Sequence, residues 1–320
     1  MQELAVCRLL ILKGRMGCAS SNILKQERPT AWLLGDAARL HLQHGPIDLI
    51  IDAAGSSAEI KRAYRQAAVA FESVLDTLAA QLPALRQESR INENFLFKGD
   101  VARRMQLAVQ PYSEFHVTPM AAVAGAVADH ILSYLIHNRA LDRAQVNNGG
   151  DIALYLSPSS ELKIGICKSQ KSTDHSDTFL IKPEDGIGGV ATSGWQGRSF
   201  SLGIADAVTV LASTAADADV AATLIANAVN LPVAQEVTRA PAASIQPDSD
   251  LGNRLVTINV APLSEINKKQ ALNAGVQCAK KLMNQGNIHS CYLHLQGQTK
   301  IVESSCYQST FCVSQRYAHC

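Results

Sequence analysis

The stretch between residues 188 and 230 constrains the fold most, because it predicts a strand and a helix in immediate succession. The run Ala207–Ala212 (AVTVLA) has the β-branched composition of a strand. Thr214 then fits a helix N-cap, and Asp217 three residues later completes a capping-box pattern. The helix should continue roughly to Val229, ahead of an Asn-Leu-Pro stop. We therefore expect the centre of the molecule to contain this strand and this helix.

One face of that helix is polar, although the helix is otherwise rich in alanine. Asp219, Thr223 and Asn227 follow one another at intervals of four residues, so their side chains share a face. The cap explains Asp217 but not Asp219. A carboxylate one turn before a hydroxyl offers two oxygens to a cation such as Mg²⁺. The alternative is a solvated polar stripe, and the spacing leaves both interpretations open.

A second motif, NNGGD, ends at Asp151 and lies between two stretches of strand composition. Asn-Gly and Gly-Asp favour turns, so the plain interpretation is a β-hairpin. The functional interpretation is that Gly149 and Gly150 let a ligand approach backbone N–H groups, as in anion-binding nests. The turn chemistry by itself is compatible with both.

A third group of candidates follows in the segment TSGWQGRSFSLGIAD. Residues 192–194 predict a turn whose hydroxyl and N–H groups could line the same cleft, although Ser and Gly also serve ordinary turns. Arg198 has a planar fork of donors that suits a carboxylate or a phosphate of a ligand. The alternative for Arg198 is a salt bridge to the acidic loop at residues 184–185. Asp206 precedes the central strand and completes this group.

The composition argues against several classes of function. With 29 basic and 28 acidic residues the net charge is +1, which leaves no electrostatic footprint for nucleic acid. No uncharged apolar run is long enough to predict a membrane span. Neither a Walker A pattern nor a G-x-G-x-x-G unit occurs. We expect a small-molecule partner, with a homo-oligomer left open.

The eight cysteines contain no C-x-x-C pair, which argues against a structural zinc site. In a chain without a recognisable secretory signal they indicate reduced thiols and a cytoplasmic protein. We expect residues 1–25 to form a loosely ordered extension, residues 26–303 a single domain, and residues 304–320 an irregular tail that contains three of the cysteines.

Hydrophobic periodicity predicts the remaining elements. Predicted strands flank the turn at residues 45–46 and the glycine pair, and others cover residues 255–260, 291–295 and 301–302. Predicted helices cover residues 57–81, 101–109 and 266–285, and another helix begins with Thr118 as N-cap and Pro119 as first residue. Frequent hairpins and few crossovers favour an α+β fold, with an antiparallel sheet that carries helices on one face.

In order along the chain, VAGAVAD (123–129), VNNGGDI (146–152), GGVATSG (188–194), VTV (208–210) and ADADVAAT (216–223) resemble the ApbE-like superfamily. Its best-known members are the Mg²⁺-dependent FAD:protein FMN transferases. Across residues 28–297 the chain more closely resembles the uncharacterised protein family number 0280, a branch of that superfamily. The resemblance implies a two-layer α+β architecture, and it places a metal-holding Asp-x-x-x-Thr pattern on Asp219 and Thr223.

Two departures separate the chain from the flavin transferases. Those enzymes carry Lys-Gly-Tyr in the first helix of the pattern, where this chain has Ala-Gly-Ala at residues 124–126. They also insert a His-x-x-Asp-Pro segment before the VTV strand, whereas here Gly194 and Val208 are only fourteen positions apart. Both missing pieces belong to the FAD-binding surface.

These observations lead to two main hypotheses. The first is a Mg²⁺-dependent enzyme with a flavin- or nucleotide-like ligand, and the second is a non-catalytic flavin- or ligand-binding accessory protein. A divergent FAD:protein FMN transferase is a further alternative, and no catalytic residue is assigned. The predicted ligand-binding residues are Asn148, Gly149, Gly150, Asp151, Thr192, Ser193, Gly194, Arg198 and Asp206, and the predicted metal ligands are Asp219 and Thr223.

The departures generate the first testable prediction. Incubation of the protein with FAD, Mg²⁺ and a flavin-acceptor protein should yield no acceptor band with in-gel flavin fluorescence, because the FAD-binding pieces are missing. A competent flavin transferase run in parallel must label the same acceptor. A fluorescent acceptor band produced by this chain would overturn the prediction.

Overall fold

The computed structural model describes residues 28–35, 38–89, 96–166, 177–303 and 311–312. The predicted extension at residues 1–25 and most of the predicted tail lie outside this part of the chain. Within the described residues, the largest sheet has nine strands, and every neighbouring pair is antiparallel. Their spatial order is β1 (Thr30–Leu33), β2 (Leu40–His44), β3 (Ile47–Gly55), β4 (Leu141–Asn148), β5 (Asp151–Leu156), β8 (Gly189–Ser193), β9 (Ala207–Ala212), β12 (Ser290–Leu295) and β13 (Gln298–Glu303).

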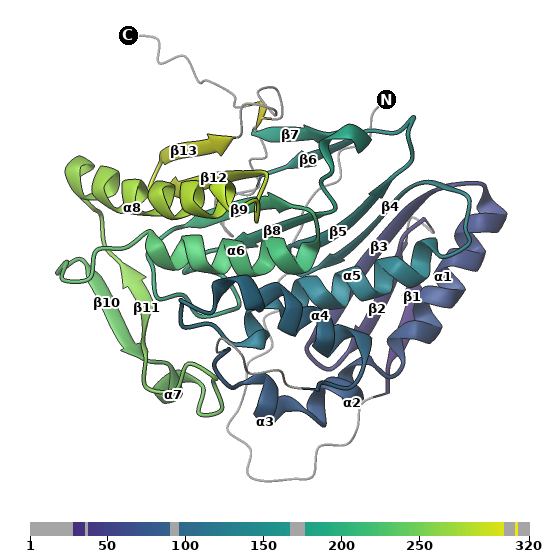
Figure 1. Cartoon of the computed structure of the whole chain (residues 1–320), viewed down its shortest axis with the longest axis horizontal. Helices are drawn as coiled ribbons and strands as arrows, with labels where there is room; N and C mark the ends of the chain where they lie inside the picture. Colours follow the sequence, from purple (N-terminus) through teal and green to yellow (C-terminus); the bar gives the residue numbers. More distant parts are fainter. Residues whose placement is uncertain (1–27, 36–37, 90–95, 167–176, 304–310, 313–320) are drawn as a thin grey trace.

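Helices cover one face of this sheet, as the sequence predicted. Figure 1 shows α1, α5, α6 and α8 side by side in front of the strands, with α4 outside them. Their apolar side chains and one face of the sheet form the main core. The helices are α1 (Ser57–Phe71), α2 (Val74–Ala79), α3 (Leu82–Leu85), α4 (Asp100–Val109), α5 (Val123–Ile136), α6 (Ala215–Ala228), α7 (Ala242–Ile245) and α8 (Glu265–Asn284).

The opposite face of the sheet carries a second, smaller core that the sequence did not predict. On β5, Ala153 belongs to the main core, whereas its neighbours Ile152 and Leu154 belong to the second. Strands β6 (Leu162–Gly165) and β7 (Thr178–Ile181) supply the other side of this core. The sheet is therefore covered on both faces here, by helices on one and by a small sheet on the other. Strand β14 (Phe311–Cys312) pairs with β7, so part of the predicted irregular tail forms a strand.

The predicted central strand and helix are present with nearly the expected bounds. All six residues of β9 are buried, because helices pack on one of its faces and the second core on the other. Thr214 caps α6, and its hydroxyl accepts a hydrogen bond of 3.1 Å from the backbone N–H of Asp217. The capping signal therefore marked the start of α6 correctly.

Two predicted helices differ from the structure. The helix expected over residues 57–81 divides into α1 and α2, and the intervening turn keeps Phe71 and Val74 both buried. Thr118 does not cap α5. The helical segment does begin at the predicted place, because Thr118 is the N-cap residue and Pro119 the first residue of a 3-10 helix (Pro119–Ala122) that leads into α5. The Thr118 hydroxyl, however, makes no cap bond and donates to Asp250 Oδ2 at 2.6 Å. Partners distant in sequence therefore replaced the local signal at Thr118.

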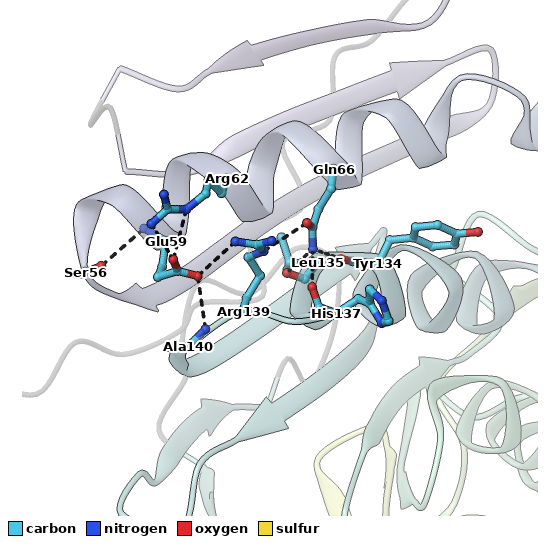
Figure 2. Close-up of polar contacts among 9 residues, drawn as sticks. All are labelled: Ser56, Glu59, Arg62, Gln66, Tyr134, Leu135, His137, Arg139 and Ala140. Atoms are coloured by element: carbon cyan, nitrogen blue, oxygen red, sulfur yellow. Dashed lines mark hydrogen bonds and ion pairs between the residues drawn. The ribbon is translucent and has the colours of Figure 1, made fainter.

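Side chains of α1 satisfy the C-terminal end of α5 (Figure 2). Glu59 accepts from the guanidinium of Arg139 at 3.4 Å and from the backbone N–H of Ala140 at 3.2 Å. Gln66 provides a side-chain cap for the last turn, where carbonyls lack partners within the helix. Its amide nitrogen donates to the carbonyls of Tyr134, Leu135 and His137. This network holds α5 in place as the chain turns into β4.

The segment Pro119–Ile136 is long and apolar enough, by length and composition alone, to cross a membrane. However, 56% of it is buried inside the protein, where α5 packs on the sheet and on α6. It also carries the buried residue Asp129, whose carboxylate bonds to backbone N–H groups of α6. This is the packing of a core helix in a globular fold.

Helices α5 and α6 approach each other closely at Gly125. A Cβ added at this position would lie 2.2 Å from the carbonyl oxygen of Ala215, well inside the contact distance. The neighbour that requires glycine at this position is the first turn of α6.

The second prediction follows from this contact. Helix propensity alone predicts that Gly125→Ala stabilises α5 by about 1 kcal/mol. We expect the opposite, a loss of roughly 1–3 kcal/mol in the free energy of unfolding, because the added methyl group overpacks the helix crossing. Gly35→Ala is the control, since a Cβ there meets nothing within 4 Å. Denaturant unfolding that shows Gly125→Ala to be as stable as the parent would contradict the close approach.

Candidate functional site

The sequence candidates converge around the turn between β4 and β5. Gly149 and Gly150 form this turn with positive φ angles of 67° and 115°. A Cβ at residue 149 would lie 1.8 Å from a terminal nitrogen of Arg198, so the guanidinium lies directly over the turn. Glycine at 149 therefore serves both the backbone conformation and the approach of Arg198.

Asn148 joins this hairpin to the start of α5. Its side chain is buried, and its amide nitrogen donates to the carbonyl of Ala124 at 3.1 Å. The neighbouring Asn147 stabilises the turn itself, because its Oδ1 accepts from the N–H of Gly150 at 2.9 Å. Both asparagines are thus used to position the turn, which leaves Gly149, Asp151 and Arg198 beside one another.

Asp219 reaches the same region from α6. Its Oδ2 accepts from the backbone N–H of Gly125 at 3.0 Å, in the first turn of α5. The N–H groups of a first turn have no partner within their own helix, and the positive end of the helix dipole favours a carboxylate there. Asp219 therefore occupies an N-terminal cap of a neighbouring helix.

Asp129 makes the reciprocal contact from α5 to α6. Its two oxygens accept from the backbone N–H groups of Ala215 at 3.0 Å and Ala216 at 2.9 Å. Burial raises the pKa of Asp129 to about 6, although these two hydrogen bonds favour the charged form. The sequence analysis missed this residue. Its signal was an aspartate inside an apolar helix, where a carboxylate needs buried partners.

Asp151 and Asp219 influence one another electrostatically. Burial raises the pKa of Asp151 to about 7, against the opposing effects of the Thr192 backbone N–H and the charge of Arg198. Burial also raises the pKa of Asp219 well above its usual range, and the negative charge of Asp151 raises it further. We call Gly149, Asp151, Arg198 and Asp219 the acidic site. It brings together a cation and two mutually repelling carboxylates from three segments of the chain, namely the β4–β5 turn, the loop before β9 and α6.

The other candidates have assignable contacts. The Thr192 and Thr209 hydroxyls lie 2.9 Å apart across β8 and β9. Ser193 is half-buried at the end of β8. Gly194 packs against the carbonyl oxygen of Asp206.

Both carboxylate oxygens of Asp206 have partners. Oδ1 accepts from the indole nitrogen of Trp195 at 3.1 Å, and Oδ2 accepts from the backbone N–H of Gln296 at 2.6 Å. The structure therefore provides Asp206 with a role in joining the loop to β12–β13, and its role as a ligand-binding residue stays a prediction.

The polar face of α6 is not a plain solvated stripe. Asn227 accepts from the backbone N–H of Leu202 at 2.8 Å and from the Ser201 hydroxyl at 3.2 Å, which anchors the loop that carries Arg198. Thr223 is half-buried between Asp219 and Asn227. Within the described residues, no three Asp, Glu, His or Cys side chains are grouped so as to hold a metal ion.

A family model described as "AbpE bacteria" matches residues 30–301 of the chain. The chain belongs to this family. A relative from Methanosphaerula palustris, named UPF0280 protein, is 32% identical over 186 residues, which cover 50% of this chain and 75% of the relative. The UPF0280 protein of Methanothermobacter thermautotrophicus is 40% identical over 116 residues, 36% of this chain and 44% of that protein. The predicted membership of family 0280 is thus confirmed.

This AbpE-family chain spans about half the length of several curated relatives that it matches. Among solved structures, it is similar to a mutant of the flavin transferase ApbE from Vibrio cholerae. The TM-score is 0.41 and the identity 13%, over 85% of this chain and 98% of that one.

The third prediction concerns the pH dependence of stability in the metal-free protein. In the folded protein the pKa of Asp151 is raised, so the chain binds a proton when it folds between about pH 4 and about pH 7. The contribution of Asp151 to stability therefore falls as the pH rises through this window. Asp151→Asn removes that effect. The free energy of unfolding of the variant minus that of the parent should therefore increase by at least about 1 kcal/mol from about pH 4.5 to about pH 8.

Unfolding in EDTA at both pH values measures this difference. Asp142→Asn, an exposed aspartate on the same hairpin, is the matched control and should show no such gain. A constant difference between parent and Asp151→Asn would show that Asp151 stays charged throughout.

Proposed function

We propose that the acidic site binds a small anionic ligand together with Mg²⁺, and that the protein has an enzymatic role there. The observation that carries this proposal is the convergence of Asp151, Asp219 and Arg198. Two carboxylates that repel each other, next to an exposed guanidinium, form an arrangement that a divalent cation and an anion would both stabilise.

The side chains present suit Mg²⁺. Asp219 and Thr223 follow one another by one helical turn and offer only oxygens, which are the ligands that this cation prefers. Two side-chain oxygens do not make a complete cage, so water and ligand oxygens would complete the coordination. When bound, the cation would polarise ligand oxygens as a Lewis acid.

The remaining residues would bind and orient the ligand. Arg198 lies over the glycine turn with its guanidinium exposed, and it can donate to a phosphate or carboxylate in a planar, two-pronged fashion. Gly149 and Gly150 have no side chains that would keep a ligand away from the backbone of the turn. The motif resemblance to the flavin transferases supports a flavin- or nucleotide-like ligand, and the cytoplasm as the compartment follows from the cysteine pattern.

A second candidate function is that of a non-catalytic, ligand-binding accessory protein. The observation that favours it is that Asp219 and Asp129 already serve as helix caps between α5 and α6. In that case the carboxylates act in folding, and only Arg198 and the glycine turn contact a ligand. A divergent FMN transferase would instead label an acceptor protein in the fluorescence experiment above.

The fourth prediction tests metal binding at the acidic site. Calorimetric titration of the protein with FMN should show tighter binding in the presence of Mg²⁺ than in EDTA. Asp219→Asn retains the shape of the side chain without its charge, and it should weaken the Mg²⁺-dependent binding at least tenfold, or about 1.4 kcal/mol. Asp217→Asn is the matched control on the same helix and should bind as the parent does.

Two outcomes would contradict the proposal. Equal Mg²⁺-dependent binding by the parent and by Asp219→Asn would remove Asp219 from the metal site. Binding that is independent of Mg²⁺, lost in Arg198→Gln but retained in Asp219→Asn, would favour the accessory protein.

A further inference from the structure

A separate two-stranded sheet lies beyond the C-terminal end of α6, at the left of Figure 1. It consists of β10 (Val237–Pro241) and β11 (Leu255–Val260), and its register places Arg239 directly opposite Thr257. Residues directly opposite each other in an antiparallel pair project to the same face, with Cβ atoms about 5 Å apart. One face of this hairpin therefore carries a half-buried guanidinium beside a buried hydroxyl.

Arg239 is a partly buried cation without an acidic partner. Its terminal nitrogen donates to Oδ1 of Asn230 at 2.5 Å, and no carboxylate among the described residues forms an ion pair with it. Glu236, the acidic residue just before β10, accepts instead from Asn267. Burial lowers the pKa of Arg239, and no neighbouring negative charge opposes that effect. A guanidinium carries five N–H donors, so most of those on Arg239 remain available.

Thr257 is a second polar group that lacks its expected partner. The residue is only 5% exposed, and its hydroxyl has no hydrogen-bond partner within the described part of the chain. Its backbone is held firmly, because its N–H donates to the carbonyl of Ser201 at 2.9 Å. A buried hydroxyl without a partner reduces stability, so its presence calls for an explanation.

Asn230 fixes the guanidinium in place. Its amide nitrogen donates to the carbonyl of Leu202 at 2.9 Å, and its Oδ1 also accepts from the backbone N–H of Leu231 at 2.8 Å. Arg239 is therefore oriented by a side chain whose own bonds are satisfied. Such prior orientation is typical of a binding group, since little side-chain freedom is left to lose.

We propose that the face of β10–β11 formed by Arg239 and Thr257 binds an oxyanion, a phosphate or a carboxylate group of a ligand. The two side chains supply N–H and O–H donors, and an anion would satisfy the hydroxyl and neutralise the guanidinium together. This oxyanion site is separate from the acidic site and does not depend on the proposed function. The loop that carries Arg198 connects the two regions, because its residues Ser201 and Leu202 bond to Thr257 and Asn230.

The test uses the full-length protein with inorganic phosphate as the probe and acetate as the carboxylate comparison. Phosphate should raise the melting temperature of the parent in a saturable manner at constant ionic strength. Arg239→Gln should reduce the phosphate affinity at least tenfold in calorimetry. Arg254→Gln changes an exposed arginine next to β11 and should retain the parent affinity. Arg198→Gln, titrated alongside, shows whether any of the phosphate binding comes from the acidic site.

Thr257→Val supplies a readout that a purely structural role would not produce. The substitution keeps the shape and removes the unpartnered hydroxyl, so the variant should melt at a higher temperature than the parent without phosphate. With phosphate, its gain in melting temperature should be smaller than that of the parent. Stronger stabilisation by acetate than by phosphate would assign the site to carboxylates.

The proposal is overturned if neither anion binds saturably, or if Arg239→Gln and Arg254→Gln bind phosphate equally. Loss of the phosphate response in Arg198→Gln, with Arg239→Gln unaffected, would place the anion in the acidic site instead.

Discussion

The reciprocal capping of α5 and α6 is the interaction on which the rest of the structure depends. Asp219 of α6 accepts from the first turn of α5 at Gly125, and Asp129 of α5 accepts from the first turn of α6. Each helix thereby provides a hydrogen-bond acceptor for first-turn N–H groups of the other helix, which have no partner within their own helix. The contact requires a glycine, because the carbonyl of Ala215 occupies the space where a side chain at 125 would begin.

The same contact determines the chemistry of the acidic site. It holds the Asp219 carboxylate near Asp151, and burial together with mutual repulsion raises the pKa of both groups. From outside the helix pair, the backbone N–H of Thr192 and the charge of Arg198 both favour the charged form of Asp151. A structural contact between helices and a candidate binding site thus share one side chain. The polar face of α6 therefore serves folding, and it is also the face on which we propose that a ligand binds.

The sheet determines which other segments lie beside this helix pair. Strand β9 leads directly into the cap of α6, and it is buried on both faces by the main core and the second core. The turn between β4 and β5 places Asp151 beside β8, which pairs with β9. At its far end α6 anchors the loop of Arg198 through Asn227, and just beyond it Asn230 holds Arg239 of the β10–β11 hairpin. One helix therefore connects the acidic site and the proposed oxyanion site.

The sequence by itself determined the elements whose signals are local. Three short-range patterns each predicted one element: the turn residues at 149–150, the cap at Thr214 and the apolar run of β9. The predicted elements together indicated the α+β class. Tertiary structure alone decided the contacts between distant segments. Thr118 bonds to Asp250 rather than capping α5, β6 and β7 cover the second face of the sheet, and Asp129 caps another helix. Hydrogen bonds and burial between residues far apart in sequence leave no periodic trace, so only the folded chain reveals them.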